Sequence, residues 1–157
     1  MNGPAPMESV RVLIRRLPHF PETWPLPDYA TPGSAGVDLR NAGPDIEIPP
    51  LGRTLVPTGL SIALPEGMEA QVRPRSGLAI HRGLGMPNAP GTIDSDYRGE
   101  LLVPLINFDR APQTIAHGER IAQLVVARVC RIEWELVEKL PAGGARGAGG
   151  FGSTGRL

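Results

Sequence analysis

Proline and glycine recur along almost the whole chain, and their spacing constrains its fold more than any other feature. The 157 residues include 20 glycines and 18 prolines, and only near the C-terminal end do the glycines cluster. Proline interrupts helices and the interiors of sheets, and glycine favours turns. We therefore expect an all-β subunit of many short strands, with one short helix at Gly77–Arg82.

Short apolar or alternating runs between these turns predict roughly ten strands. The turns include Pro65–Gly67 and His117–Glu119. Strands are expected at Val10–Leu17, Val37–Arg40, Asp45–Ile48, Arg53–Pro57, Leu60–Leu64, Met68–Arg73, Thr92–Asp94, Glu100–Phe108, around Ile115, at Ile121–Val129 and, ending the regular part, at Ile132–Leu136. So many short strands indicate a sandwich or a jelly roll.

Charge and composition exclude several classes of protein. The formal net charge is zero, so no broad basic field is available to bind nucleic acid. Cys130 is the only cysteine, which rules out an intrachain disulfide and predicts a small core residue. No apolar stretch approaches the ~20 residues of a membrane span, and the N-terminus lacks a signal-peptide pattern. We expect a cytoplasmic protein with no membrane or nucleic-acid partner.

The C-terminal segment differs in kind from the rest of the chain. Residues 141–157 are mostly Gly, Ala, Ser and Thr, so we predict a β domain over 1–140 and a flexible tail over 141–157. Consecutive glycines allow the backbone to wrap around an anion, and Phe151 offers a flat face that could stack on a base. A simple linker is the alternative, although a linker has no use for an isolated phenylalanine.

The segment G-T-I-D-S-D-Y-R-G-E at 91–100 places Asp94 at the end of a predicted strand. A carboxylate held at a strand end can orient and deprotonate a water molecule. The alternative is an ordinary acidic turn, because Asp and Ser are common turn residues.

Three further positions offer groups for a ligand. Ser76 follows Arg73-Pro74-Arg75 and is a natural helix N-cap, so a helix N-terminus beside an arginine could bind an anion. An ordinary cap with a surface arginine is the alternative. Gln123 lies inside an apolar run and either satisfies backbone groups or faces a ligand. Asp38 follows a flexible turn. The chain's three histidines show no metal-ligand spacing and are expected at the surface or as caps.

Taken in order, five segments resemble the motifs of the trimeric dUTPase family. They are A-G-V-D-L at 35–39, R-S-G-L-A at 75–79, G-T-I-D-S-D-Y-R-G-E at 91–100, G-E-R-I-A-Q-L at 118–124 and R-G-A-G-G-F-G-S-T-G at 146–155. Only the residues before Ala35 and the connecting loops lie outside the resemblance. It implies a distorted jelly-roll, β-barrel-like subunit and a homotrimer, with each active site completed by a tail from a neighbouring chain. The implied reaction is attack of water on the α-phosphorus of dUTP, giving dUMP and pyrophosphate, which limits uracil in DNA and supplies dUMP for thymidylate synthesis.

The resemblance also implies a role for each matching residue. Asp94 would be the base, and Tyr97 would lie under the deoxyribose and exclude a 2′-hydroxyl. Mg²⁺ would be bound by the triphosphate and water without a direct protein ligand, with Asp38 touching its shell through water. The implied substrate-binding residues are Asn88, Gly91, Thr92 and Ile93 for uracil, Arg75, Ser76 and Gly77 for the β-phosphate, Gln123 for the α-phosphate, and Arg146, Phe151, Gly152, Ser153 and Thr154 for closure over base and γ-phosphate.

Other functions are compatible with parts of this pattern. A dCTP deaminase shares the fold, but that family's second motif resembles R-S-S-L rather than the R-S-G-L found here, and it lacks the glycine-phenylalanine tail. A nucleotide sensor without catalysis would not benefit from Asp94 near triphosphate charge. A purely structural trimer would leave the tail unexplained.

Overall fold

The computed structural model describes residues 9–143, and all but one of its regular elements are strands. The single helix is short, as the spacing of proline and glycine predicts. The elements are β1 (Leu13–Arg16), β2 (Val37–Arg40), β3 (Ile46–Ile48), β4 (Arg53–Ala63), β5 (Met68–Pro74), α1 (Ser76–Arg82), β6 (Leu84–Gly85), β7 (Gly91–Ile93), β8 (Glu100–Asn107), β9 (Gln113–Ile115) and β10 (Arg120–Arg128). The predicted all-β class with one short helix is confirmed.

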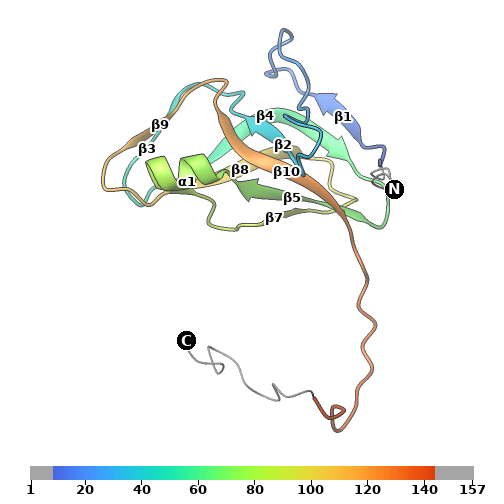
Figure 1. The fold of residues 1–157 in the computed structure, drawn as a ribbon. Coiled ribbons are helices and arrows are strands. Elements are labelled where there is room, and N and C mark those ends of the chain that lie inside the picture. Colours follow the sequence, from blue (N-terminus) through green and yellow to red (C-terminus); the bar gives the residue numbers. More distant parts are fainter. Residues whose placement is uncertain (1–8, 144–157) are drawn as a thin grey trace, which may run out of the picture.

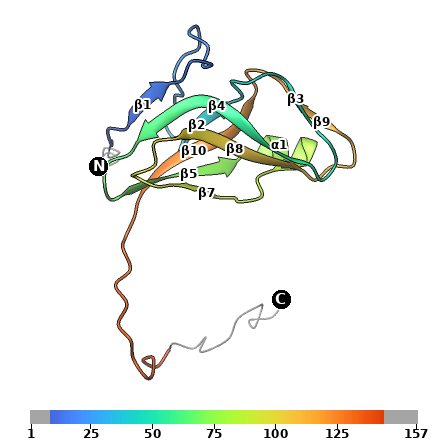
Figure 2. The same ribbon diagram turned by 180° about the vertical axis from the view of Figure 1, so that it is seen from behind.

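Two four-stranded antiparallel sheets face each other and form the body of the subunit. One has the order β1-β4-β8-β6 and the other β2-β10-β5-β7, while β3 and β9 form a separate two-stranded ribbon. Neighbouring strands are mostly far apart in sequence, as in a jelly roll. The two sheets lie one behind the other, and the ribbon extends beyond them beside α1 (Figure 1, Figure 2).

The core lies between the two sheets and follows the period of two that strands impose. On β8, every second side chain points inward and is buried. On β10, Ala122 is buried and Leu124 and Val126 pack against the core, whereas Gln123 and Val125 alternate with them. The outer face of the β2-β10-β5-β7 sheet is therefore free to carry polar side chains.

The proline-rich segment before β2 is anchored by aromatic rings. The rings of Phe20 and Trp24 pack edge to face with centroids 5.8 Å apart, and Trp24 lies 4.9 Å from the exposed His117 ring. Gly118 has a positive φ of 80°, and a β-carbon there would come within 3.2 Å of Trp24. Trp24 thus packs against the turn that leads into β10.

Several boundaries differ from the sequence prediction. The two strands predicted on either side of Thr58 and Gly59 form one strand, β4, with a register shift between Pro57 and Ser61. Gly59 has a φ of 68°, and a β-carbon there would lie 2.9 Å from Phe20 Cβ, so both the backbone conformation and the close packing favour glycine. The two-residue strand β6 was not predicted, since two residues carry no periodicity.

The end of the body also differs. β10 ends at Arg128, so the strand predicted at Ile132–Leu136 is not formed. Val129 is still tied to the body, because its N–H donates to the Gly67 carbonyl over 3.0 Å. Cys130 is exposed, and its expected place in the core was wrong because the chain leaves the sheet just before it. We call residues 130–140 the arm, which runs away from the sheets (Figure 1).

Candidate active site

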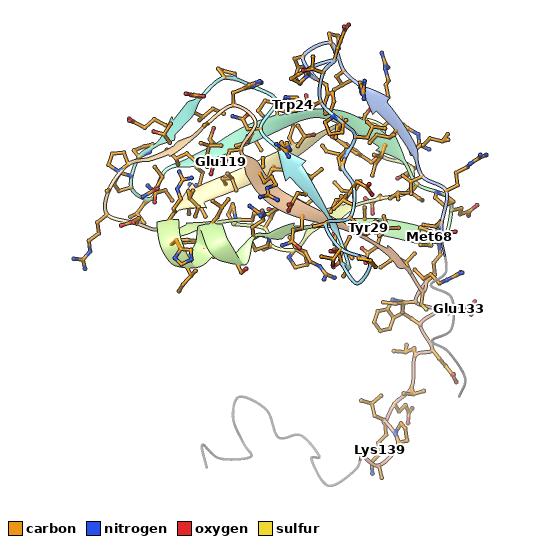
Figure 3. The ribbon with its side chains drawn as sticks, turned by 45° about the horizontal axis from the view of Figure 1, so that its top comes forward. Trp24, Tyr29, Met68, Glu119, Glu133 and Lys139 are labelled. Atoms are coloured by element: carbon orange, nitrogen blue, oxygen red, sulfur yellow. The ribbon has the colours of Figure 1, made fainter. Side chains whose placement is uncertain are left out.

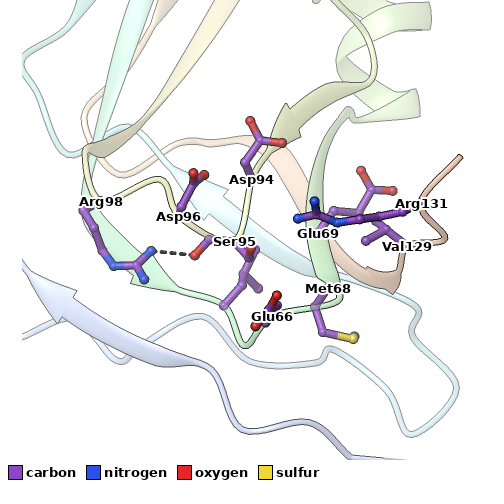
Figure 4. A pocket seen from close by; sticks show the side chains of 10 residues that line it. Glu66, Met68, Glu69, Asp94, Ser95, Asp96, Arg98, Val129 and Arg131 are labelled. Carbon is purple, nitrogen blue, oxygen red and sulfur yellow. Dashed lines mark hydrogen bonds between the residues drawn. The ribbon is translucent and has the colours of Figure 1, made fainter. Parts of the chain in front are cut away.

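Asp94 follows β7 and begins a tight turn at one end of the β2-β10-β5-β7 sheet. Its carbonyl accepts a hydrogen bond from the Tyr97 N–H over 3.1 Å, and its side chain is exposed. The strand thus fixes the backbone of Asp94 while its carboxylate projects into solvent (Figure 4). A carboxylate placed in this way can accept a proton from a bound water.

Side chains of the same turn hold it in shape. The Arg98 guanidinium donates to the carbonyls of Ser95 over 2.6 Å and Tyr97 over 2.7 Å (Figure 4). The Tyr97 hydroxyl donates to the Glu100 carbonyl over 2.9 Å. Gly99 leaves room for this arrangement, because a β-carbon there would lie 2.3 Å from the Tyr97 hydroxyl. These bonds hold the turn that carries Asp94.

The pocket beside Asp94 is acidic. It has a volume of about 610 Å³ and contains the carboxylates of Glu66, Glu69, Asp94 and Asp96 against two guanidinium groups, those of Arg98 and Arg131. By formal charge the carboxylates exceed the arginines by two. Because a triphosphate is itself strongly negative, this pocket alone repels it.

The residues expected to contact uracil precede Asp94 along the chain. β7 is the edge strand of its sheet, so one side of its backbone is open to a ligand. Gly91 is buried, and a β-carbon there would come within 3.3 Å of the Asn88 amide nitrogen. Asn88 and Thr92 are exposed, and Ile93 packs against the core. The expected base-reading residues thus form one continuous segment.

A second polar group lies at the opposite end of the same sheet. Asp38 of β2 forms an ion pair with Arg75, whose Nε lies 3.0 Å from Oδ1, and accepts a hydrogen bond from Arg120 Nη1 over 3.2 Å. Gln123 of β10 pairs in register with Asp38 on one side and Arg73 on the other. The structure therefore places residues of three separate motifs near one another: Arg75 and Gln123, expected to bind phosphates, and Asp38, expected near the magnesium shell.

Ser76 does not cap the helix as the sequence predicted. The N-cap position is Arg75, in an extended conformation, and no side chain bonds to the helix start. Ser76 is the first residue of α1 and is exposed, as is Gly77, which has nothing within 4 Å of the place a β-carbon would occupy. The serine hydroxyl is therefore not used as a cap, and the glycine leaves space for close approach of a ligand.

One chain does not bring Asp94 and Arg75 together. Ile93 pairs with Ala70 on β5, and Arg75 follows the far end of that strand. Five strand positions at ~3.3 Å each separate Ala70 from Arg75 by roughly 17 Å. A second pocket of about 350 Å³ is lined by Asp38 and Arg120, and it shares no residue with the pocket of Asp94.

The remaining expectations fall outside these two groups. The tail residues Arg146, Phe151, Gly152, Ser153 and Thr154 lie outside the described residues. Within residues 9–143, no group of three or more His, Cys, Asp or Glu side chains could hold a metal ion. No helix in that range is long and apolar enough to cross a membrane.

Sequence reasoning missed two residues that shape these groups. Arg120 pairs with Asp38, and Arg98 bridges the turn after Asp94. Both residues lie inside the motifs that carry the resemblance, so the motifs could have indicated them. The sequence could not indicate their partners, because Asp38 is distant from Arg120 in sequence and a backbone carbonyl acceptor is not specified by residue type.

Comparison with known proteins gives a consistent result. The family model described as dUTPase matches residues 22–155, so the match begins earlier than the motifs predicted. The chain is 56% identical over 147 residues to a deoxyuridine 5′-triphosphate nucleotidohydrolase of Anaeromyxobacter sp. (strain Fw109-5), covering 94% of this chain and 99% of that relative. It is 53% identical over 154 residues to the protein of the same name from Dinoroseobacter shibae, with the same coverage. Among solved structures, it is similar to the dUTPase of Staphylococcus bacteriophage 80alpha with dUpNHpp, at a TM-score of 0.77 and 23% identity over 92% of this chain and 98% of that one.

Proposed function

The chain belongs to the dUTPase family and hydrolyses dUTP to dUMP and pyrophosphate, and we propose that Asp94 activates the attacking water in a site completed by neighbouring copies. The observation that carries this proposal is the separation of Asp94 from Arg75 along β5. A base and a phosphate site at opposite ends of one sheet meet only when two chains pack together.

Asp94 would act as the general base. Its carboxylate is exposed at a strand end, where a water molecule can lie between it and the α-phosphorus. A positioned base and an in-line water remove much of the entropic barrier to attack. Attack breaks the bond from the α-phosphorus to the bridging oxygen, so pyrophosphate leaves and the new oxygen stays on dUMP.

The phosphates would be bound by Arg75, Ser76 and Gly77 of a second copy, with Gln123 near the α-phosphate. The cluster of Asp38, Arg75 and Arg120 has a formal excess of one positive charge, opposite in sign to the pocket of Asp94. Bringing the two ends together would place cations beside the triphosphate and the base beside the α-phosphorus.

Magnesium fits this site as a companion of the substrate. We propose that its ligands are phosphate oxygens and water, in keeping with the reluctance of Mg²⁺ to lose its water. Bound there, it would neutralise triphosphate charge. Asp38, whose carboxylate already pairs with two arginines, was expected to touch the magnesium shell through water.

Substrate selection would come from the segment before and after Asp94. Asn88, Gly91, Thr92 and Ile93 would contact uracil through the open edge of β7, with no space for a 5-methyl group. The Tyr97 ring would lie under the deoxyribose and exclude a 2′-hydroxyl. The proposed enzyme acts on free nucleotides in the cytoplasm and needs no nucleic-acid or membrane partner.

The arm supports assembly into a homotrimer. Its apolar side chains alternate along the chain and are unusually exposed, with Ile132 at 70%, Trp134 at 87% and Leu136 at 100%. This period of two suits a strand laid on another surface, and exposed apolar area of this kind marks an interface. Figure 3 places Glu133 and Lys139 on the arm, away from both sheets. We propose that the arm packs on a neighbour and delivers the tail to that neighbour's site.

Hydrolysis in ¹⁸O-labelled water tests the reaction directly. The proposal predicts one ¹⁸O atom in dUMP and none in pyrophosphate, with dTTP, dCTP and UTP as much poorer substrates. Label in pyrophosphate would exclude attack at the α-phosphorus. Ammonia release from dCTP would instead indicate a deaminase.

A further inference from the structure

We propose that Asp38 and Arg120 are positioning residues for Arg75, and that Asp38 acts on the triphosphate through Arg75 rather than through the magnesium shell. The inference rests on the proposed role of Arg75 as a phosphate-binding residue. It gives Arg120 a role in orienting Arg75, in addition to the positive charge that it contributes to the cluster.

The contacts of Asp38 are both made to arginines. One carboxylate oxygen lies 3.0 Å from Arg75 Nε in an ion pair, and the other accepts a hydrogen bond from Arg120 Nη1 over 3.2 Å. The Asp38 and Arg75 side chains are 23% and 27% exposed, so water competes only partly for these bonds. A carboxylate shared by two guanidinium groups is already neutralised and has little reason to attract a hydrated cation.

Arg75 is held at two points. Its Nε forms an ion pair with Asp38 at 3.0 Å, and its Nη1 donates a hydrogen bond to the carbonyl of Arg120 over 3.2 Å. Within residues 9–143, no hydrogen bond is made by Nη2, so this nitrogen can still donate to a ligand. A guanidinium held at two of its nitrogens has lost its rotational freedom before the ligand arrives, which lowers the entropic cost of binding.

Sheet topology explains why only an arginine at position 75 can contact both Asp38 and the Arg120 carbonyl. β10 lies between β2, which carries Asp38, and β5, whose end precedes Arg75. With strands about 4.8 Å apart, the Arg75 side chain must cross β10 to reach Asp38, a span of roughly 10 Å. A lysine has a single point of charge and cannot bond to Asp38 and to the Arg120 carbonyl in the same planar arrangement.

The electrostatic and positioning roles of Asp38 predict opposite results. Asp38→Asn removes a negative charge beside two arginines, so Coulomb attraction alone would tighten binding of a triphosphate. A positioning role predicts weaker binding, because Arg75 loses the charged partner that orients it. A contact with the magnesium shell predicts weaker binding only when Mg²⁺ is present.

Titration calorimetry with purified Asp38→Asn separates these roles. We expect the non-hydrolysable analogue dUpNHpp and dUDP to bind about tenfold more weakly than to the unmodified protein. The factor should be the same with saturating Mg²⁺ and with EDTA, and dUMP binding should change by less than about twofold. Tighter binding, a loss seen only with Mg²⁺, or an equal loss for dUMP would each overturn the inference.

Glu119→Gln is the matched control. It breaks the ion pair of Glu119 with Arg82, whose side chains are 23% and 28% exposed, almost the same as those of the Asp38–Arg75 pair. Within residues 9–143, no hydrogen bond or ion pair joins the side chain of Glu119 or Arg82 to Arg75, so dUpNHpp affinity should stay within about twofold. A loss as large as that of Asp38→Asn would mean that breaking any such ion pair weakens binding, and the inference would fail.

Arg75→Lys separates failure of the positioning inference from failure of the proposed phosphate-binding role of Arg75. If Arg75→Lys leaves dUpNHpp affinity unchanged, the proposed phosphate-binding role of Arg75 fails. If Arg75→Lys weakens binding and Asp38→Asn does not, the role of Arg75 stands and only the positioning inference fails.

Discussion

The two ends of the β2-β10-β5-β7 sheet differ in charge and in how their side chains are held. At the Asp94 end, carboxylates outnumber arginines, and Arg98 and Tyr97 bond to carbonyls of their own turn. At the other end, the arginines are in excess, and Asp38, Arg75 and Arg120 come from three different segments. The side chains at the Asp94 end are held by contacts within one turn, whereas those at the other end are held by contacts between segments that the sheet brings together.

This difference indicates that each end of the sheet lacks a group that the other end supplies. An acidic turn can supply a base but repels a triphosphate, whereas a cationic cluster can bind phosphate but has no base. Electrostatic complementarity of this kind favours contact between opposite ends of two copies. A closed ring of such head-to-tail contacts repeats the same site at every boundary.

Replacement of Asp94 by Asn gives the largest expected effect. A positioned general base contributes about 10²–10⁴-fold to the rate, so kcat should fall by that factor. The affinity for dUpNHpp should change little, because the proposed phosphate-binding residues lie at the other end. Asp96→Asn, in the same pocket, is the control and should keep most of its activity. If Asp94→Asn retained more than about half of kcat, Asp94 would not be the base.

Substitutions in the tail test whether residues 141–157 complete the active site together with the two ends of the sheet. Phe151 lies outside the described residues. Stacking on a base is worth about 1–3 kcal/mol, so Phe151→Ala should lower kcat/KM by about 5- to 150-fold. The control is Phe108→Ala, at a 62% exposed phenylalanine outside both polar groups. Unchanged kcat/KM, with full activity after deletion of 146–157, would make the tail a simple tether.

Substitution of the arm should weaken assembly without touching either end of the sheet. Trp134→Ser removes the largest exposed aromatic group of the arm, and a buried interface tryptophan is often worth 2 kcal/mol or more. Dissociation of the trimer should therefore become easier by about 30-fold or more, as measured by sedimentation. Glu133→Ser, on the alternate side of the arm, should have little effect. A monomer mass for the unmodified chain at micromolar concentration would contradict the proposed trimer.

The smallest expected effect concerns one bond of the Asp94 turn. Tyr97→Phe removes the hydrogen bond to the Glu100 carbonyl, which should lower the free energy of unfolding by about 0.5–1.5 kcal/mol. The ring remains, so discrimination against UTP should be retained in kinetic assays. A loss of discrimination would show that the hydroxyl, rather than the ring, excludes the 2′-hydroxyl.

The sequence predicted the strands well where periodicity was clear. Val37–Arg40 was predicted to the residue, and β5, β8 and β10 to within one residue at each end. The strand predicted at Ile132–Leu136 does alternate in polarity, but in one chain these residues have no partner surface. Cys130 was misplaced for the same reason, because hydrophobicity alone does not say whether a surface is covered within the chain.

The sequence named candidate residues for the site but not their arrangement. Motif order gives Asp38, Arg75, Asp94 and Gln123 but not which of them lie together. That grouping depends on strand order and register, which join residues far apart in sequence. The capping role expected of Ser76 failed locally, because the helix begins one residue earlier, after an extended Arg75.

A mixed-chain experiment tests most directly whether the site is divided between chains. Asp94→Asn and Arg75→Ala chains carrying different tags would be co-expressed, and hybrids containing both would be purified through the two tags in turn. If Asp94 and Arg75 of one site come from different chains, about a third of the sites in the purified hybrid trimers are restored, and activity should rise far above that of either variant alone. If both residues of a site come from the same chain, every site keeps one defect, and hybrids with no more activity than the parent variants would contradict the account.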